Sequence, residues 1–332
     1  MSAPGTAFGP LTLCPRKVEL WVGPIGRQQR VARCWESRSV TRWALRSKDA
    51  TASIQPLLTS SSPPTGSCVG GDDTHMMLAL AESLLACDGV VQAQHLGYTF
   101  AAAYREQPWR GYGAGPPRVF APASRGVSYV DAAGTLFDGA GSLGNGAAMR
   151  CAPAAVVGFP DPGLSMPIAA DQAVVTHAHP EGRDGAVMLA AVVHLGLATP
   201  TTEPLDITRI KPGELQLQSP AMRAVWGELL DAATSTSKLT ELAQQLGTSP
   251  AASQSVPTAI AVALAVDGDV ISTIRAAIVL GGDTDTIAAM AGSVAGAHHG
   301  IAELPADLMA RLEAGDRIAQ LADRLAELPG RR

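Results

Sequence analysis

Apolar residues in this chain recur mainly at the three- and four-residue spacing of an α-helix. After residue 72, one such face collects Met77, Ala81, Leu84 and Leu85. The two-residue alternation of a half-buried strand is almost absent. Aromatic residues make up only 4% of the chain, so the core must be built from Ala, Leu, Val and Ile. The sequence therefore predicts an all-α fold.

Glycine and proline divide this helical pattern into segments. Helices are expected from Asp72 onward and at 185–198, 221–245, 257–267, 270–280, 285–298 and 306–327. Loops are expected at 51–70, 110–118, 134–146 and 199–220. No repeat of 20–50 residues is present, so a solenoid is not predicted.

The composition excludes several classes of protein. The longest apolar runs, 186–193 and 259–266, have eight residues, whereas a membrane-spanning helix needs about 20. A net charge of −5 argues against a general nucleic-acid binder. The five cysteines form no CxxC pair and favour neither a disulfide framework nor a zinc ribbon. A reducing, intracellular compartment fits this cysteine usage best.

Positive charge is concentrated at the N-terminus. Residues 1–48 carry nine Lys or Arg and two acidic residues, although the whole chain is acidic. Such a composition is typical of a mitochondrial transit peptide, but no amphipathic apolar face accompanies it. We interpret this stretch as an atypical, poorly ordered leader and keep a targeting segment as the alternative. Cytoplasm, nucleus and mitochondrial matrix are all consistent with this pattern.

Acidic residues form two clusters where helices are expected to begin: Gly71-Asp72-Asp73-Thr74 and Gly282-Asp283-Thr284-Asp285-Thr286. One Asp at a helix start needs no function, because it accepts backbone N–H groups. Two per cluster exceed that need, and like charges this close call for a compensating cation. Oxygen ligands from Asp and Thr suit Mg²⁺, Mn²⁺ or Ca²⁺. Since 211 positions separate Asp72 from Asp283, the alternatives are a shared two-metal site and two separate helix caps.

A glycine-rich stretch and a histidine pair are the other polar motifs. Residues 141–150 read GSLGNGAAMR, and backbone N–H groups in such a loop can bind phosphate, although a plain tight turn is the commoner explanation. The stretch is neither a Walker A motif nor a Rossmann fingerprint. His177 and His179 have no third ligand at metal-binding spacing, so a hydrogen-bonding role at a helix boundary is favoured.

Taken in order, these motifs resemble one known family. The order is Gly-Asp-Asp-Thr, Gly-Tyr-Gly-Ala-Gly, Gly-Ser-x-Gly-Asn-Gly-Ala-Ala-Met-Arg, Thr-His-x-His-Pro, Val-Pro-Thr-Ala-Ile and Gly-Gly-Asp-Thr-Asp-Thr-Ile-Ala. It is similar to the ADP-ribosylglycohydrolase family over about residues 36–305. Residues 110–115 and 255–260 look most like the branch that removes ADP-ribose from serine and degrades poly(ADP-ribose).

The resemblance implies a compact orthogonal helical bundle of the ADP-ribosylglycohydrolase type, with two Mg²⁺ ions in a cleft. It implies one domain over residues 36–328, preceded by the basic segment 1–35. Carried over by position, the metal ligands would be Asp72, Asp73, Asp283, Asp285 and Thr286. In the family, the ions hold the ribose hydroxyls and a water beside the anomeric carbon.

The resemblance also implies roles along the substrate. The diphosphate and distal ribose would be lined by Gly141, Ser142, Gly144 and Asn145. Gly111 would approach the ligand by its backbone, Phe137 would stack on adenine, and His177 would hydrogen-bond along the ADP-ribose channel. Glu36 fits the position of the acid/base that exchanges a proton with the leaving group. A solvated surface Glu is the alternative for Glu36.

Three departures from the family pattern bear on activity. Residues 22–35 are basic and lack the Gly-Asp pair that usually precedes the catalytic Glu. Gly71 stands where the family usually has Thr or Ser, so a hydroxyl ligand is lost there. Leu143 replaces a position that is often aromatic in the serine-directed branch.

Together, these residues predict a Mg²⁺-dependent hydrolase that cleaves the bond between ADP-ribose and a protein side chain, serine first, or within poly(ADP-ribose). One alternative is a non-catalytic ADP-ribose binder that has lost turnover. Another is a hydrolase of arginine-linked or O-acetyl-ADP-ribose. The expected partners are ADP-ribose and ADP-ribosylated proteins, without direct nucleic-acid or membrane binding, and the expected state is a monomer.

Overall fold

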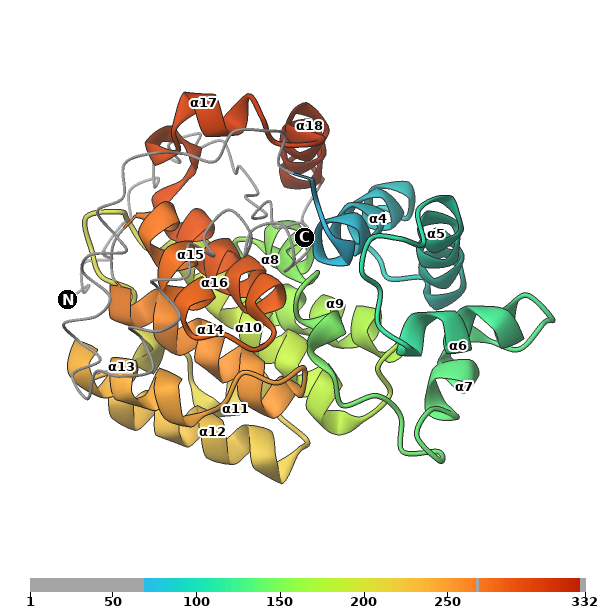
Figure 1. Ribbon diagram of the computed structural model, residues 1–332, viewed down its shortest axis with the longest axis horizontal. Helices are drawn as coiled ribbons and strands as arrows, with labels where there is room; N and C mark the ends of the chain where they lie inside the picture. Colours follow the sequence, from blue (N-terminus) through green and yellow to red (C-terminus); the bar gives the residue numbers. More distant parts are fainter. Residues whose placement is uncertain (1–68, 267–268, 329–332) are drawn as a thin grey trace, which may run out of the picture.

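The computed structural model describes residues 69–266 and 269–328, and within these ranges the chain is helical without a β-strand. Its α-helices (Figure 1) are α4 (Asp72–Ala86), α5 (Ala93–Glu106), α6 (Gly115–Ala123), α7 (Tyr129–Gly134), α8 (Ala152–Gly158), α9 (Pro162–Val174), α10 (Pro180–Ala198), α11 (Pro212–Leu215), α12 (Pro220–Ala232), α13 (Thr236–Gln245), α14 (Ala252–Val266), α15 (Val270–Val279), α16 (Thr284–His299), α17 (Ala306–Met309) and α18 (Gly315–Ala326). Three short 3₁₀ turns are η1 (Asn145–Ala147), η2 (Ile207–Arg209) and η3 (Ile301–Glu303). The predicted all-α orthogonal bundle is confirmed.

Some helix boundaries differ from the predicted ones. The run expected at 221–245 is divided into α12 and α13. The run expected at 306–327 is interrupted before α18, where Ala314 adopts a left-handed φ of +58°. The loop expected at 110–118 ends early, because Pro116 and Pro117 lie in the first turn of α6, where their missing N–H groups cost nothing.

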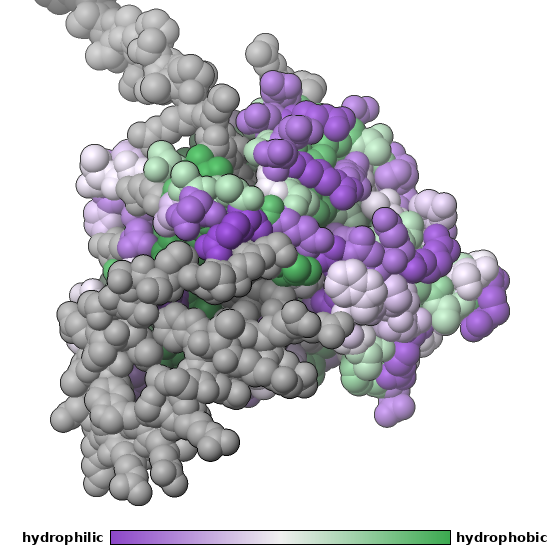
Figure 2. All heavy atoms as spheres, turned by 45° about the horizontal axis from the view of Figure 1, so that its top comes forward, coloured by the Kyte–Doolittle hydropathy of each residue, from purple (hydrophilic) through white to green (hydrophobic). Residues whose placement is uncertain are grey.

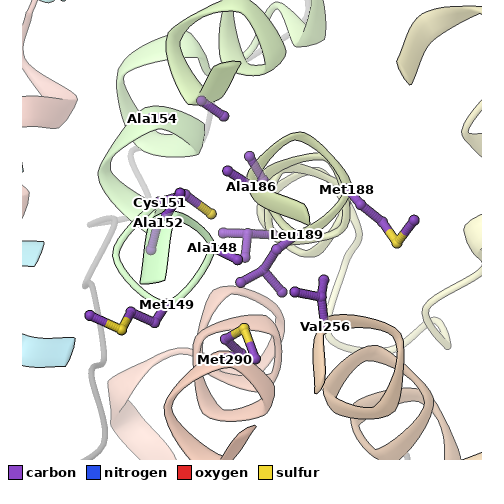
Figure 3. Packing of buried hydrophobic residues seen from close by; sticks show 14 of the residues in the cluster. Ala148, Met149, Cys151, Ala152, Ala154, Ala186, Met188, Leu189, Val256 and Met290 are labelled. Carbon is purple, nitrogen blue, oxygen red and sulfur yellow. The ribbon is translucent and has the colours of Figure 1, made fainter. Parts of the chain in front are cut away.

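The core is built around α10, which packs against α8, α9, α14 and α16. Figure 3 shows Leu189 of α10 pointing toward Val256 of α14 and Met290 of α16, with Ala148 close by. All four side chains are buried. Because alanine has a small side chain, its frequent use here lets the helices approach closely and still fill the interior at normal density.

The C-terminal helix α18 packs on α4 and α8, and Figure 1 shows α18 beside α4. Its buried positions are Ile318, Leu321, Ala322 and Leu325, which recur at the spacing of one helical face. Burial of these side chains stabilises the contact by about 25 cal/mol per Å² of apolar surface removed from water. As a result, a segment near the end of the chain holds the helix on which the first acidic cluster lies.

None of the described helices combines the length and the apolar character that crossing a bilayer requires. Figure 2 shows one face of the molecule, on which hydrophilic residues are interspersed with small apolar groups wherever the surface is not grey.

Candidate active site

The two acidic clusters begin two helices that the fold brings together. Asp72 and Asp73 occupy the first turn of α4, and Asp283 precedes α16, with Asp285 in its first turn. The charges of Asp283 and Asp285 both raise the pKa of Asp72 and of Asp73, so the four carboxylates lie within electrostatic reach of one another. Asp283 makes no side-chain capping bond to α16. This convergence favours a shared acidic centre over two separate helix caps.

The carboxyl groups of the acidic centre disfavour one another's charged form. Burial, followed by the charge of Asp285, raises the pKa of Asp72 to about 7. Burial and the charge of Asp72 raise the pKa of Asp73 well above its usual range, and burial also raises that of Asp283. Asp73 Oδ1 is buried and has no hydrogen-bond partner among the described residues. A buried carboxylate oxygen without a partner is costly unless a cation binds it.

The donor set suits a hard divalent cation, because carboxylate and hydroxyl oxygens are the ligands that Mg²⁺ and Ca²⁺ prefer. Thr286 Oγ1 donates to Asp283 Oδ1 at 3.2 Å, so its hydroxyl oxygen lies at the centre. Within the described ranges, no three Asp, Glu, His or Cys side chains already converge closely enough to form a metal site. The orphaned Asp73 oxygen and the mutual repulsion nevertheless fit a cation at this place.

The glycine-rich loop contacts the second acidic cluster directly. Asn145 Nδ2 donates to Asp283 Oδ2 at 2.7 Å, and its backbone N donates to Pro250 O at 2.9 Å. Ser142 is buried, and its Oγ accepts from Gly144 N at 3.3 Å. Gly141 has a φ of +78°, and a Cβ there would lie 2.6 Å from His179 N. The loop is therefore fixed against both α10 and α16.

Gly111 lies beside the first acidic cluster. Its φ is +98°, a left-handed conformation that favours glycine, and a Cβ there would lie 3.6 Å from Asp72 Oδ1. The preceding carbonyl, Arg110 O, accepts from Asp72 N at 3.0 Å. Gly71 is buried just before α4 and supplies no hydroxyl to the centre. Gly111 is thus part of the wall of the acidic centre.

A partly buried ion pair that the sequence motifs did not reveal holds the start of α4. Arg110 donates to Glu313 with both terminal nitrogens, at 2.8 and 2.9 Å, and also to Gly70 O. Glu313 Oε2 in turn accepts from Gly70 N at 2.9 Å. The pairing lowers the pKa of Glu313 and raises that of Arg110. No local sequence signal pairs residues 203 positions apart, so this contact could not have been found without the fold.

The two histidines of the Thr-His-x-His-Pro motif have different environments. His179 precedes α10, and its ring Nδ1 accepts from Glu181 N at 3.2 Å, which confirms the predicted helix-boundary role. His177 is buried, with Nδ1 at 2.8 Å from Thr176 Oγ1. Burial and the charge of Arg150 lower the pKa of His177 to about 3, so its ring is neutral at physiological pH.

Phe137 lies in the turn after α7 and leaves 53% of its surface exposed. The guanidinium of Arg118 lies 5.7 Å from the centre of its ring. An exposed ring beside a cation is suited to stacking on a planar base. Glu36 lies outside the described residues, so its position relative to the acidic centre is not part of this geometry.

Comparisons with known proteins point to the family that the sequence motifs resemble. The family model described as ADP-ribosylglycohydrolase matches residues 36–332. ADP-ribosylhydrolase ARH3 of Homo sapiens is 34% identical over 275 residues, which cover 70% of this chain and 72% of that protein. ADP-ribosylhydrolase ARH3 of Danio rerio is 35% identical over 288 residues, which cover 77% of each.

A solved structure described as an ADP-ribosylglycohydrolase-related protein complex has the same fold. Its TM-score is 0.57 at 26% sequence identity, and the match covers 81% of this chain and 89% of that chain. The family model extends over most of the sequence and includes both acidic clusters. The chain belongs to the ADP-ribosylglycohydrolase family.

Proposed function

We propose that this chain is a Mg²⁺-dependent hydrolase that cleaves the glycosidic bond between ADP-ribose and a protein side chain, with serine as the first candidate, or within poly(ADP-ribose). The observation that carries the proposal is the convergence of the α4 and α16 starts around an unpartnered Asp73 oxygen. The names of the similar proteins support ADP-ribose as the group that is released.

The metal ligands would be Asp72, Asp73, Asp283, Asp285 and Thr286, holding two Mg²⁺ ions. When bound, such ions orient ribose hydroxyls and lower the pKa of a water beside the anomeric carbon. Asn145 supports this set by donating to Asp283 Oδ2, which leaves the other oxygen of that carboxylate to Thr286. At Gly71, where the chain has no hydroxyl, a water would complete the set.

The rest of ADP-ribose would extend along the glycine-rich loop. Gly141, Ser142, Gly144 and Asn145 would contact the diphosphate and the distal ribose, and His177 would donate a hydrogen bond from beneath the loop. Phe137 would stack on adenine, and Gly111 would meet the ligand through its backbone. The support is that the loop contacts α16 at Asp283 and α10 beside His179.

Glu36 would serve as the acid/base at the leaving group. The family match begins at this residue, which supports including it in the domain over 36–328. Its carboxyl would exchange a proton with the oxygen of the departing side chain while a water attacks the anomeric carbon. A monomer in an intracellular compartment remains our working proposal.

Gly71 favours one alternative, a non-catalytic ADP-ribose binder, because a missing hydroxyl ligand weakens metal affinity. Hydrolysis of arginine-linked or O-acetyl-ADP-ribose is the other alternative, since those substrates share the ADP-ribose part. A serine-linked peptide, an arginine-linked peptide and O-acetyl-ADP-ribose, each with Mg²⁺ and with EDTA, separate these cases. We expect Mg²⁺-dependent release of ADP-ribose from the serine-linked peptide alone.

Replacing Asp285 by Ala should reduce release from the serine-linked peptide by more than about 100-fold, because a ligand of the metals is lost. The exposed Asp323 on α18, replaced by Asn, is the matched control and should leave release unchanged. Unchanged release by Asp285→Ala would refute the metal assignment. No release by the wild-type chain, together with ADP-ribose binding in calorimetry, would instead establish the non-catalytic binder.

A further inference from the structure

Arg150 is fully buried, and among the described residues it contacts no carboxylate. Its Nε donates to Gln172 Oε1 at 2.7 Å, and its Nη2 donates to Gln172 O at 3.1 Å and to Thr176 Oγ1 at 2.8 Å. Its guanidinium lies 4.3 Å from the centre of the Phe100 ring. A buried charge held only by neutral groups is costly, so its retention calls for a role.

The contacts of Gln172 fix how Arg150 is oriented. Gln172 Nε2 donates to Ala147 O at 2.9 Å and to Ala169 O at 3.1 Å. Both amide hydrogens are therefore used, and the amide oxygen must face Arg150. The guanidinium has one orientation, with Nη2 directed at the hydroxyl of Thr176.

The hydroxyl of Thr176 has little freedom. A guanidinium only donates, so Thr176 Oγ1 accepts from Arg150. Thr176 is itself buried, and besides Arg150 its hydroxyl has one hydrogen-bonding partner among the described residues, His177 Nδ1, at 2.8 Å. If Nδ1 carried a proton, Thr176 would accept twice and its own hydrogen would be buried without an acceptor. Thr176 must therefore donate to Nδ1.

The ring of His177 lies under the glycine-rich loop. A Cβ built on Gly146 would lie 2.8 Å from His177 Cε1 and 3.0 Å from Nε2, and one built on Gly144 would lie 3.6 Å from Nε2. No hydrogen bond to Nε2 is present within the described ranges. With Nδ1 accepting from Thr176, the proton of the neutral ring is on Nε2, at the edge of the ring that faces this loop.

We propose that Arg150 and Thr176 are positioning residues, which hold His177 as the Nε2–H tautomer so that it donates a hydrogen bond to an anionic group bound at loop 141–146. The anionic group is a diphosphate, and this part rests on the proposed function. The low pKa of His177, caused by burial and by Arg150, agrees with a neutral donor. Arg150 thus acts twice: it orients the hydroxyl of Thr176 and disfavours a second proton on the ring.

The first test is the protonation state of His177 in the unaltered chain. Nitrogen NMR of ¹⁵N-histidine-labelled protein at pH 7.5 distinguishes a protonated from a bare ring nitrogen, and His177→Asn identifies the signals. We expect a proton on Nε2 and a bare Nδ1, without any ligand. A proton on Nδ1, or on both nitrogens, would refute the proposed relay of hydrogen bonds from Arg150 through Thr176 to His177. This holds whatever the protein hydrolyses.

The second test uses Thr176→Val, which keeps the shape and removes the hydroxyl, with Thr176→Ser as its matched control. We expect Thr176→Val to weaken ADP-ribose binding in calorimetry about tenfold, the effect of one lost hydrogen bond to a charged group. Its His177 signals should show a mixture of tautomers, whereas Thr176→Ser should retain the Nε2–H signal and near-normal affinity. Thermal unfolding of both variants separates this effect from loss of folding.

The outcomes separate the relay from the function. An Nε2–H signal that Thr176→Val shifts, with unchanged ADP-ribose affinity, would mean that the relay exists and that His177 does not bind the diphosphate. An unshifted signal in Thr176→Val would remove Thr176 from the proposal. The whole proposal is supported if Thr176→Val gives a mixture of tautomers and binds ADP-ribose about tenfold more weakly. Thr176→Ser should then retain both the Nε2–H signal and the affinity.

Discussion

The environment of Asp73 is unfavourable for a residue whose role is only structural. It is buried near three other carboxylates, and one of its oxygens has no hydrogen-bond partner in the described part of the chain. Natural sequences break local rules of this kind chiefly at functional sites, where another component compensates. Burying this carboxyl group beside the others therefore lowers the stability of the metal-free fold.

Replacing Asp73 by Asn should therefore stabilise the chain in EDTA, because Asp73 must either bind a proton on folding or stay charged among three other carboxyl groups, whereas Asn is always neutral. We expect a gain of about 1–3 kcal/mol, which raises the melting temperature by a few degrees. The same variant should lose the stabilisation that Mg²⁺ gives the wild type. Differential scanning calorimetry in EDTA and in Mg²⁺ measures both effects.

Asp323→Asn, at an exposed position of α18, is the control for the change of charge and should move the melting temperature by less than about 1 °C. A lower melting temperature of Asp73→Asn in EDTA would contradict the interpretation of Asp73 as an uncompensated charge.

Helices of this protein were predictable where an apolar stripe is long. The helices α10, α15 and α16 lie close to their predicted ranges, since Ala, Val, Leu and Ile recur there without a break. The helices α5 to α9 were not separately predicted. Several begin with proline or contain it, as α9 does at Pro167, and proline read locally indicates a loop. Tertiary packing on α10 overrides that signal.

The turn between α15 and α16 depends on two glycines, and one of them positions Asp283. Gly281 and Gly282, between α15 and α16, both have a left-handed φ, at +77° and +69°. A Cβ on Gly282 would lie 2.4 Å from Thr248 O, whereas one on Gly281 would meet nothing within 4 Å. Asp283 N donates to that same Thr248 O at 2.8 Å. Gly282 therefore sets the place of Asp283, and Gly281 only has to turn the chain.

Gly282→Ala should lower Mg²⁺ affinity at least tenfold, because the added methyl group displaces the turn that carries Asp283. Gly281→Ala is the matched variant: it carries the same backbone penalty of about 1–2 kcal/mol and should leave Mg²⁺ affinity nearly unchanged. Mg²⁺ titration by calorimetry and urea unfolding together measure the two effects. Equal Mg²⁺ affinity of the two variants would refute the steric argument.

The molecule as a whole assembles one site from separated segments. The residue types in both acidic clusters pointed to a divalent cation, but one sequence could not show whether the clusters meet. The fold brings the clusters within electrostatic reach of each other, because α4 packs on α8, α16 packs on α10, and α8 and α10 pack together. Arg110 with Glu313 and Arg150 with Thr176 could not be predicted, because no periodicity marks which distant side chains pair.

Mg²⁺ should therefore stabilise the first turn of α4 and the first turn of α16 together. We expect slower amide hydrogen exchange in the first turns of α4 and of α16 when Mg²⁺ is added, although these turns are more than 200 residues apart in sequence. The exposed helix α13 should show no change and is the internal reference. Protection of one acidic cluster alone would argue against a shared centre.

The order of these segments along the chain has a consequence for synthesis. Asp72 and Asp73 leave the ribosome before the second cluster, and Asp283 and Asp285 follow 211 and 212 positions after them. Glu313, which secures the start of α4, follows later still. A nascent chain consequently has no complete acidic centre until residue 285 has been made. A message that stops before the codon for Asp283 yields only Asp72 and Asp73, two of the five proposed metal ligands.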